Sequence, residues 1–83
     1  MTTRNEKKAT PKALELYQAH RADIARLIDW LQMELDKSDE QARIDPLNWG
    51  HAGSMGQVRS NLIDTLEFIS GIERERIEET LGE

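Results

Sequence analysis

The clearest pattern in the chain is the spacing of apolar residues between residues 11 and 35. Large apolar side chains recur three and four positions apart, with Arg21 filling the one missing step. This spacing places them on one face of an α-helix. The face covers about half of the circumference, which is wider than a coiled-coil seam, so we expect it to contact two neighbours. Its main residues are Leu14, Tyr17, Ile24, Ile28, Leu31 and Leu35.

Both ends of this first helix can be predicted from local signals. Thr10 can cap the unpaired amides of the first turn, and Pro11 is tolerated there. The polar run DKSDEQARIDP has no apolar period of its own, and Pro46 disfavours helical geometry in the residue before it. We therefore expect the helix to end between residues 37 and 43, with a connection over about residues 38–47.

A second apolar stripe predicts a second helix that reaches about Ser70. Its start lies between residues 46 and 54, and two signals compete. Asn48 or Asp45 can cap an early start, whereas the sequence that begins at Ser54 fits a capping box for a late one. The stripe favours the early start, although each glycine inside a helix costs about 1 kcal/mol. The stripe consists of His51, Met55, Val58, Leu62, Leu66 and Ile69.

Gly71 interrupts the helical pattern near the C-terminus. Ser70 and Glu73 form a second capping box, which predicts a short third helix over about residues 71–81. A continuous helix bent at Gly71 fits equally well. Within this segment, Arg74 and Glu78 are spaced for a favourable pair on one helix face.

These elements predict an all-α fold. Two long helices joined by a short connection form an antiparallel two-helix hairpin. Residues 1–10 are expected to be a disordered basic arm, and residues 11–83 a helical hairpin domain. Two helices cannot cover so broad an apolar face, so we expect a homodimer that forms a four-helix bundle. The alternative is a three-helix monomer. The expected dimer or core face consists of Leu14, Tyr17, Ile24, Ile28, Leu31, Leu35, Met55, Val58, Leu62, Leu66 and Ile69.

Composition narrows the function further. The chain has 83 residues and no cysteine, which excludes disulfides and thiolate metal sites. Its net charge of −5 divides into +3 for residues 1–12 and −8 for the rest. An acidic body argues against nucleic acid as a partner. The polar N-terminus does not resemble a signal peptide, and no stretch is apolar enough to span a membrane. We therefore expect a cytoplasmic protein.

The candidate chemistry is sparse. The two histidines, His20 and His51, lie at opposite ends of the expected hairpin, about 20 Å apart. The Glu-x-x-His pattern of metal-binding bundles is broken by Tyr17 before the first histidine and by Asn48 before the second. We therefore predict no catalytic, cofactor-binding or metal-binding residues and a protein that is not an enzyme.

A cluster at the start of the second helix is the candidate interaction surface. It consists of Trp49, Gly50, His51, Gly53 and Gly56. Tryptophan often anchors protein interfaces, and glycines let another backbone approach closely. If the protein has a localised functional surface, we expect it here, with a protein as the possible partner, although aromatic residues beside turns more often pack internally. Two alternatives are a small-molecule or metal-binding module built on the same region, and simple packing of Trp49 onto the end of the bundle.

The helical spacing in both halves of the chain predicts a far-ultraviolet circular dichroism spectrum dominated by α-helix. Runs of β-branched residues are few, so little strand signal is expected. A spectrum with substantial strand content would contradict the all-α assignment.

Overall fold

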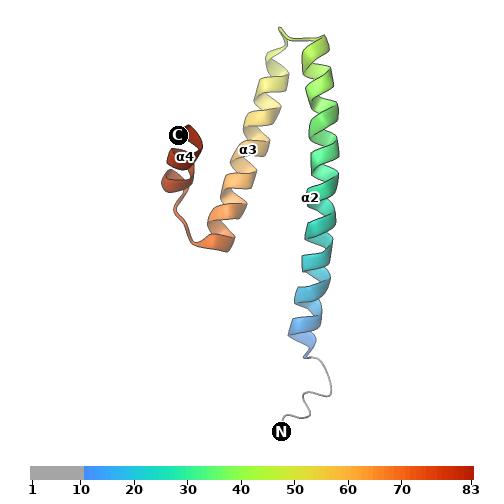
Figure 1. Cartoon of the computed structure of the whole chain (residues 1–83), viewed down its shortest axis with the longest axis vertical. Helices are drawn as coiled ribbons and strands as arrows, with labels where there is room; N and C mark the ends of the chain where they lie inside the picture. Colours follow the sequence, from blue (N-terminus) through green and yellow to red (C-terminus); the bar gives the residue numbers. More distant parts are fainter. Residues whose placement is uncertain (1–10) are drawn as a thin grey trace. The chain divides into compact units, whose positions relative to one another are not determined.

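The computed structural model describes residues 11–83, and every regular element among them is a helix (Figure 1). Helix α2 is Lys12–Ile44, α3 is Trp49–Ser70 and α4 is Arg74–Gly82. The predicted all-α class is therefore confirmed for the described residues. The predicted arm, residues 1–10, and the predicted cap Thr10 lie outside this range. The chain divides into two compact units, residues 1–40 and 41–83, and α2 crosses the boundary.

The described part of the first unit is one long helix. The first turn of α2 is closed by a bond from the Glu15 amide to the Pro11 carbonyl oxygen at 3.0 Å. Good helix formers such as Ala, Leu, Glu, Gln, Lys and Arg make up most of the helix that follows. Its start agrees with the prediction to within one residue.

The predicted end of α2 is wrong. The helix runs to Ile44, so much of the expected connection at residues 38–47 is helical. An apolar period is needed for packing but not for helix formation, and Glu, Gln, Ala and Arg in this run all favour helix. Pro46 is the feature that stops the helix, because it disfavours helical geometry at Asp45. Only residues 45–48 connect α2 to α3.

The early start of the second helix is confirmed. Asn48 is the N-cap of α3, and its Oδ1 accepts a hydrogen bond from the Gly50 amide at 2.8 Å. Asn48 Nδ2 in turn donates to Asp45 Oδ2 at 3.1 Å, which holds the capping side chain in place. The competing start at Ser54 is wrong, because Ser54 lies inside α3.

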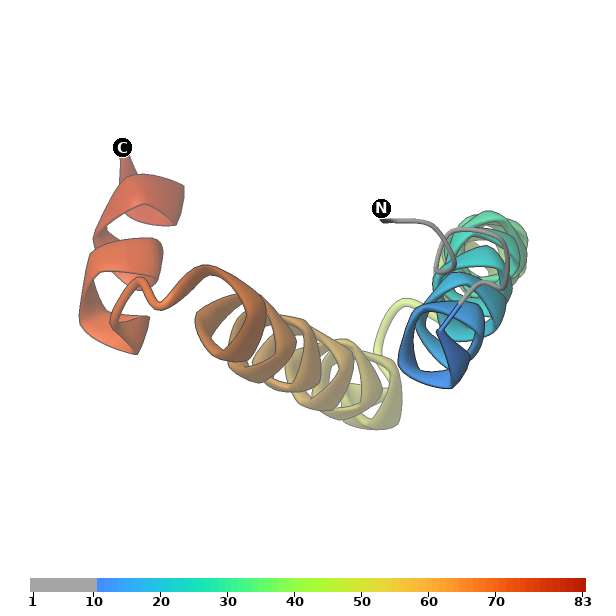
Figure 2. The same cartoon turned by 90° about the horizontal axis from the view of Figure 1, so that it is seen from below.

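The chain turns sharply after α3. Gly71 has a φ of 76°, a left-handed conformation that suits glycine, and its amide donates to the Glu67 carbonyl oxygen at 2.9 Å. The Ser70 hydroxyl accepts from the Ile72 amide at 3.1 Å rather than from the Glu73 amide expected in a capping box. A separate third helix, α4, then folds back beside α3 (Figures 1 and 2). The alternative of one continuous bent helix is wrong.

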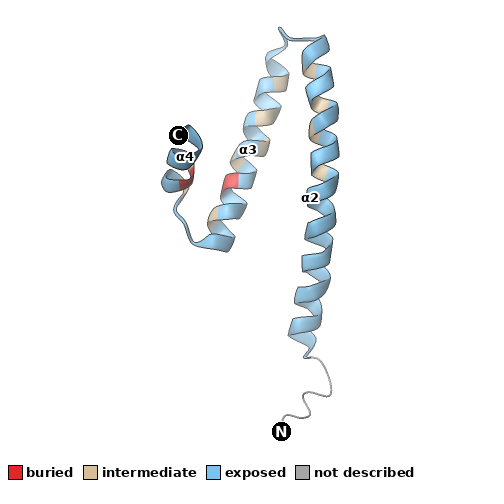
Figure 3. Cartoon of the chain, viewed as in Figure 1, coloured by how far each residue is buried: buried red, intermediate tan, exposed pale blue. Residues whose placement is uncertain are grey.

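The second unit has a very small core. Ile63 of α3 and Ile77 of α4 are 4% and 7% exposed, and they are the only buried side chains in residues 11–83 (Figure 3). Neither isoleucine belongs to the predicted apolar faces. Ile63 lies about 100° around α3 from Leu62 of the predicted stripe, so α4 covers a different side of the helix. Leu62 and Ile69 therefore remain exposed, and Leu66, which borders α4, is 46% exposed. Met55 and Val58 of the same predicted stripe are half-buried.

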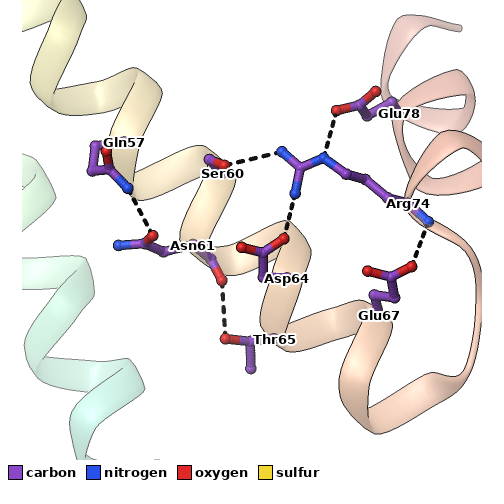
Figure 4. Close-up of polar contacts among 8 residues, drawn as sticks. All are labelled: Gln57, Ser60, Asn61, Asp64, Thr65, Glu67, Arg74 and Glu78. Carbon is purple, nitrogen blue, oxygen red and sulfur yellow. Dashed lines mark hydrogen bonds and ion pairs between the residues drawn. The ribbon is translucent and has the colours of Figure 1, made fainter.

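Polar contacts join α4 to α3 around Arg74 (Figure 4). Arg74 Nε donates to Glu78 Oε2 at 3.1 Å, which confirms the predicted pair. One terminal guanidinium nitrogen donates to Ser60 Oγ at 3.0 Å, and the other pairs with Asp64. The Arg74 amide donates to Glu67 Oε2 at 3.1 Å, so a side chain of α3 caps the first turn of α4. These bonds hold α4 against Ile63.

Truncation of Ile63 should destabilise the protein far more than truncation of an exposed aromatic residue. Ile63→Ala removes a side chain that is 4% exposed and should cost about 2–5 kcal/mol of unfolding free energy. Phe68→Ala removes a larger side chain that is 88% exposed and should change stability by about 0.5 kcal/mol or less. Urea unfolding at one fixed protein concentration measures both, and equal losses would contradict the assigned core.

Candidate interaction surfaces

The predicted cluster at the start of α3 is open to solvent. Trp49 is the first residue of α3 and is 86% exposed, and its neighbour Leu47 is also exposed. Trp49 is therefore not packed internally in the single chain. Large apolar side chains that are exposed this fully are available for contact with another protein.

The three glycines of this cluster have different reasons to be there. A Cβ on Gly50 would lie 3.0 Å from the capping oxygen of Asn48, so the helix cap favours glycine at this position. A Cβ on Gly53 or Gly56 would meet nothing within 4 Å. These two glycines leave bare backbone facing open space, and each costs helix stability. Packing within the described chain does not explain them.

His51 lies beside the connection and is half-buried. Its Nε2 is 3.9 Å from Asp45 Oδ2, which is too long for a hydrogen bond, and it has no hydrogen-bond partner. The same carboxylate oxygen already accepts from Asn48 Nδ2. Within residues 11–83, no three His, Asp or Glu side chains converge on a possible metal position.

The second candidate surface is the apolar face of α2. Only Leu31 and Leu35 among its predicted members are half-buried. Ile28, near its centre, is 59% exposed. The other exposed members are Leu14, Tyr17 and Ile24. An exposed apolar surface of this length is typical of a protein interaction site.

Helix α2 carries a small hydrogen-bonded group of side chains one turn apart. Trp30 Nε1 and Lys37 Nζ each donate to Glu34 Oε2 at 3.1 Å. The hydrogen bond from Lys37, followed by that from Trp30, lowers the pKa of the Glu34 carboxyl. The indole nitrogen of Trp30 thus has a hydrogen-bond partner on the helix itself.

Three residues that matter in the second unit were not singled out as core or anchor from the sequence: Ile63, Ile77 and, for its contacts with α3, Arg74. A signal was present for Ile77 only. Ile72, Ile77 and Leu81 give residues 72–81 an apolar side of their own, and a short helix with such a side must pack against a neighbour.

Comparisons of the chain with protein-family models, curated proteins and solved structures found no match. None of the helices in residues 11–83 is both long enough and apolar enough to cross a membrane. Function is therefore inferred from the two exposed surfaces.

Because Trp49 is exposed, Trp49→Ala should keep the helicity of the wild type and change the unfolding free energy by about 0.5 kcal/mol or less. Circular dichroism and urea unfolding measure this, with Ile63→Ala as the destabilised reference. A loss of about 3–5 kcal/mol would instead mean that Trp49 is packed in a core.

Proposed function

We propose that this chain is a non-enzymatic interaction protein that acts through self-association. In the proposed assembly, α2 and α3 form an antiparallel hairpin, and two hairpins pack into a four-helix bundle. The observation that carries the proposal is the apolar face of α2, whose large side chains are exposed through most of the first unit. A cytoplasmic location, expected from the polar N-terminus, stays a prediction.

Energetics favour association. In residues 11–83 only Ile63 and Ile77 are buried, which is little for a domain of this size. Complete burial of a leucine or isoleucine stabilises by about 1.5–3 kcal/mol, and those on α2 are about half exposed. Covering four of them would therefore contribute about 3–6 kcal/mol, a large part of the stability of a small domain. Folding and association are therefore expected to occur together.

The short connection supports the hairpin. Residues 45–48 leave few conformations other than an antiparallel arrangement of the helices that they join. Such a hairpin would cover one side of the broad α2 face with α3. The other side would still need a partner, and so would Leu62, Leu66 and Ile69 of α3, which are exposed.

A second copy of the chain is the partner that fits this need. Both exposed faces are helical stripes of large aliphatic side chains, so they can interdigitate as helices do in bundles. Twofold dimers are also the commonest oligomers, because one self-complementary patch is used twice.

The surface around Trp49 would remain available in this dimer for a further protein. Exposed Leu47 and Trp49, next to the open backbone of Gly53 and Gly56, favour a docking patch. The second candidate function is a small-molecule or metal-binding module at the same place. The unpartnered Nε2 of His51 is the observation that supports it.

Ile28→Glu should break the dimer. The substitution puts a charge at the centre of the α2 face, and burying an unpaired charge costs several kcal/mol, so association should weaken by about 100-fold or more. Size-exclusion chromatography with light scattering over a range of concentrations should give twice the 9.6 kDa chain mass for the wild type. The variant should elute with the mass of one chain.

Ala22→Glu is the matched control. Ala22 lies on the opposite side of α2, and a glutamate there is four residues before Arg26, a favourable spacing. This variant should keep the wild-type mass. A wild-type chain that stays monomeric at all concentrations, or an Ile28→Glu chain that associates as the wild type does, would contradict the proposal.

A further inference from the structure

The second unit contains a groove between α3 and α4. It has a volume of about 490 Å³ and is lined by Leu66, Ile72, Arg76, Ile77, Thr80 and Leu81. Ile77 forms its buried floor, whereas Leu66, Ile72 and Leu81 are about half exposed. Arg76 and Thr80 are the polar members of an otherwise apolar lining.

We propose that this groove binds the N-terminal third of α2 from a second copy of the chain, residues 12–22. This proposal rests on the self-association proposed above and adds the place where the partner's helix lies. Three observations support it: the shape of the groove, the lengths of the helices and the distribution of charge.

The groove suits a helix better than a small molecule. Small-molecule sites usually bury most of the ligand, but the aliphatic walls here are half exposed. Leu66 belongs both to the groove and to the exposed stripe of α3, which continues through Leu62 and Ile69. The apolar surface is therefore longer than the groove itself, as a surface that receives a helix has to be.

The lengths of the helices identify the segment. Helix α2 has 33 residues and α3 has 22, which correspond to about 50 Å and 33 Å. In an antiparallel hairpin, α3 would therefore leave about eleven residues at the N-terminus of α2 unpaired. Leu14, Leu16 and Tyr17 lie in that segment and are exposed.

Charge complementarity points to the same segment. Residues 12–22 carry two basic side chains and one acidic side chain, a net charge of +1. Residues 73–83, which include α4, carry two basic and five acidic side chains, a net charge of −3. Placing the N-terminal part of one copy beside α4 of the other brings these opposite charges together, which favours this pairing over a like-charged one.

Cross-linking between copies tests the proposal cleanly, because the chain has no cysteine of its own. One chain carries Tyr17→Cys, at the centre of the α2 face, and a ¹⁵N-labelled chain carries Thr80→Cys, at the groove. The two chains are unfolded in urea, mixed and refolded, so that mixed dimers can form. A short bismaleimide then joins thiols that lie close together, and mass spectrometry identifies the mixed product by its label.

Two control variants place the thiol on the opposite side of each helix. Ala19→Cys lies two residues from Tyr17 but on the opposite side of α2, and Glu75→Cys lies on the side of α4 away from the groove. Each control thiol is paired with the test thiol of the other helix, which gives the pairs Ala19–Thr80 and Tyr17–Glu75. The Tyr17–Thr80 pair should cross-link at least about tenfold faster than either of them, because proximity raises the effective thiol concentration.

The remaining outcomes separate this inference from the proposed function. In one outcome, the wild-type chain has the mass of a dimer while the test pair and both control pairs cross-link at equal rates. This result would overturn the groove assignment and leave self-association standing. A monomeric wild-type chain would overturn both. Cross-linking that occurs only when Tyr17→Cys and Thr80→Cys are on the same chain would mean that the groove holds the chain's own α2, which also overturns the proposal.

Discussion

Arg74 is the residue on which the second unit depends. Its guanidinium contacts Ser60 and Asp64 of α3 and Glu78 of α4, and its amide is bonded to Glu67. A helix of nine residues is too short to be stable by itself, so these contacts and the packing of one isoleucine must keep α4 folded. Because α4 is held against one side of α3, Leu62 and Ile69 of the apolar stripe stay exposed, and Leu66 is only partly covered at the groove.

Much of the fold could be predicted from sequence because its signals are local. The apolar period identified both long helices, Asn48 marked the start of α3, and Gly71 marked the break before α4. The end of α2 could not be placed, because the polar run before Pro46 lacks apolar residues but still favours helix. The side of α3 that receives α4 was also missed, since it depends on how sharply the chain turns after Ser70.

The candidate surfaces, too, could be predicted only in part from the sequence. The sequence identified which residues form the α2 face and the cluster at Trp49, but not whether they are covered. The same stripe of Ile24 and Ile28 is compatible with a packed core or with an exposed face. The structure shows that both side chains are exposed in the single chain, which the pattern of one helix could not tell, because exposure depends on long-range contacts. The Arg74 contacts to α3 were missed for this reason as well.

The cap that Glu67 provides to α4 has a consequence for how the protein opens. A carboxylate at the start of a helix satisfies an unpaired amide and opposes the positive end of the helix dipole, and here it comes from the preceding helix. Fraying of the last turns of α3 removes that carboxylate from α4. The end of α3 and the start of α4 therefore form one cooperative unit that opens and closes together, although Gly71 separates them in the chain.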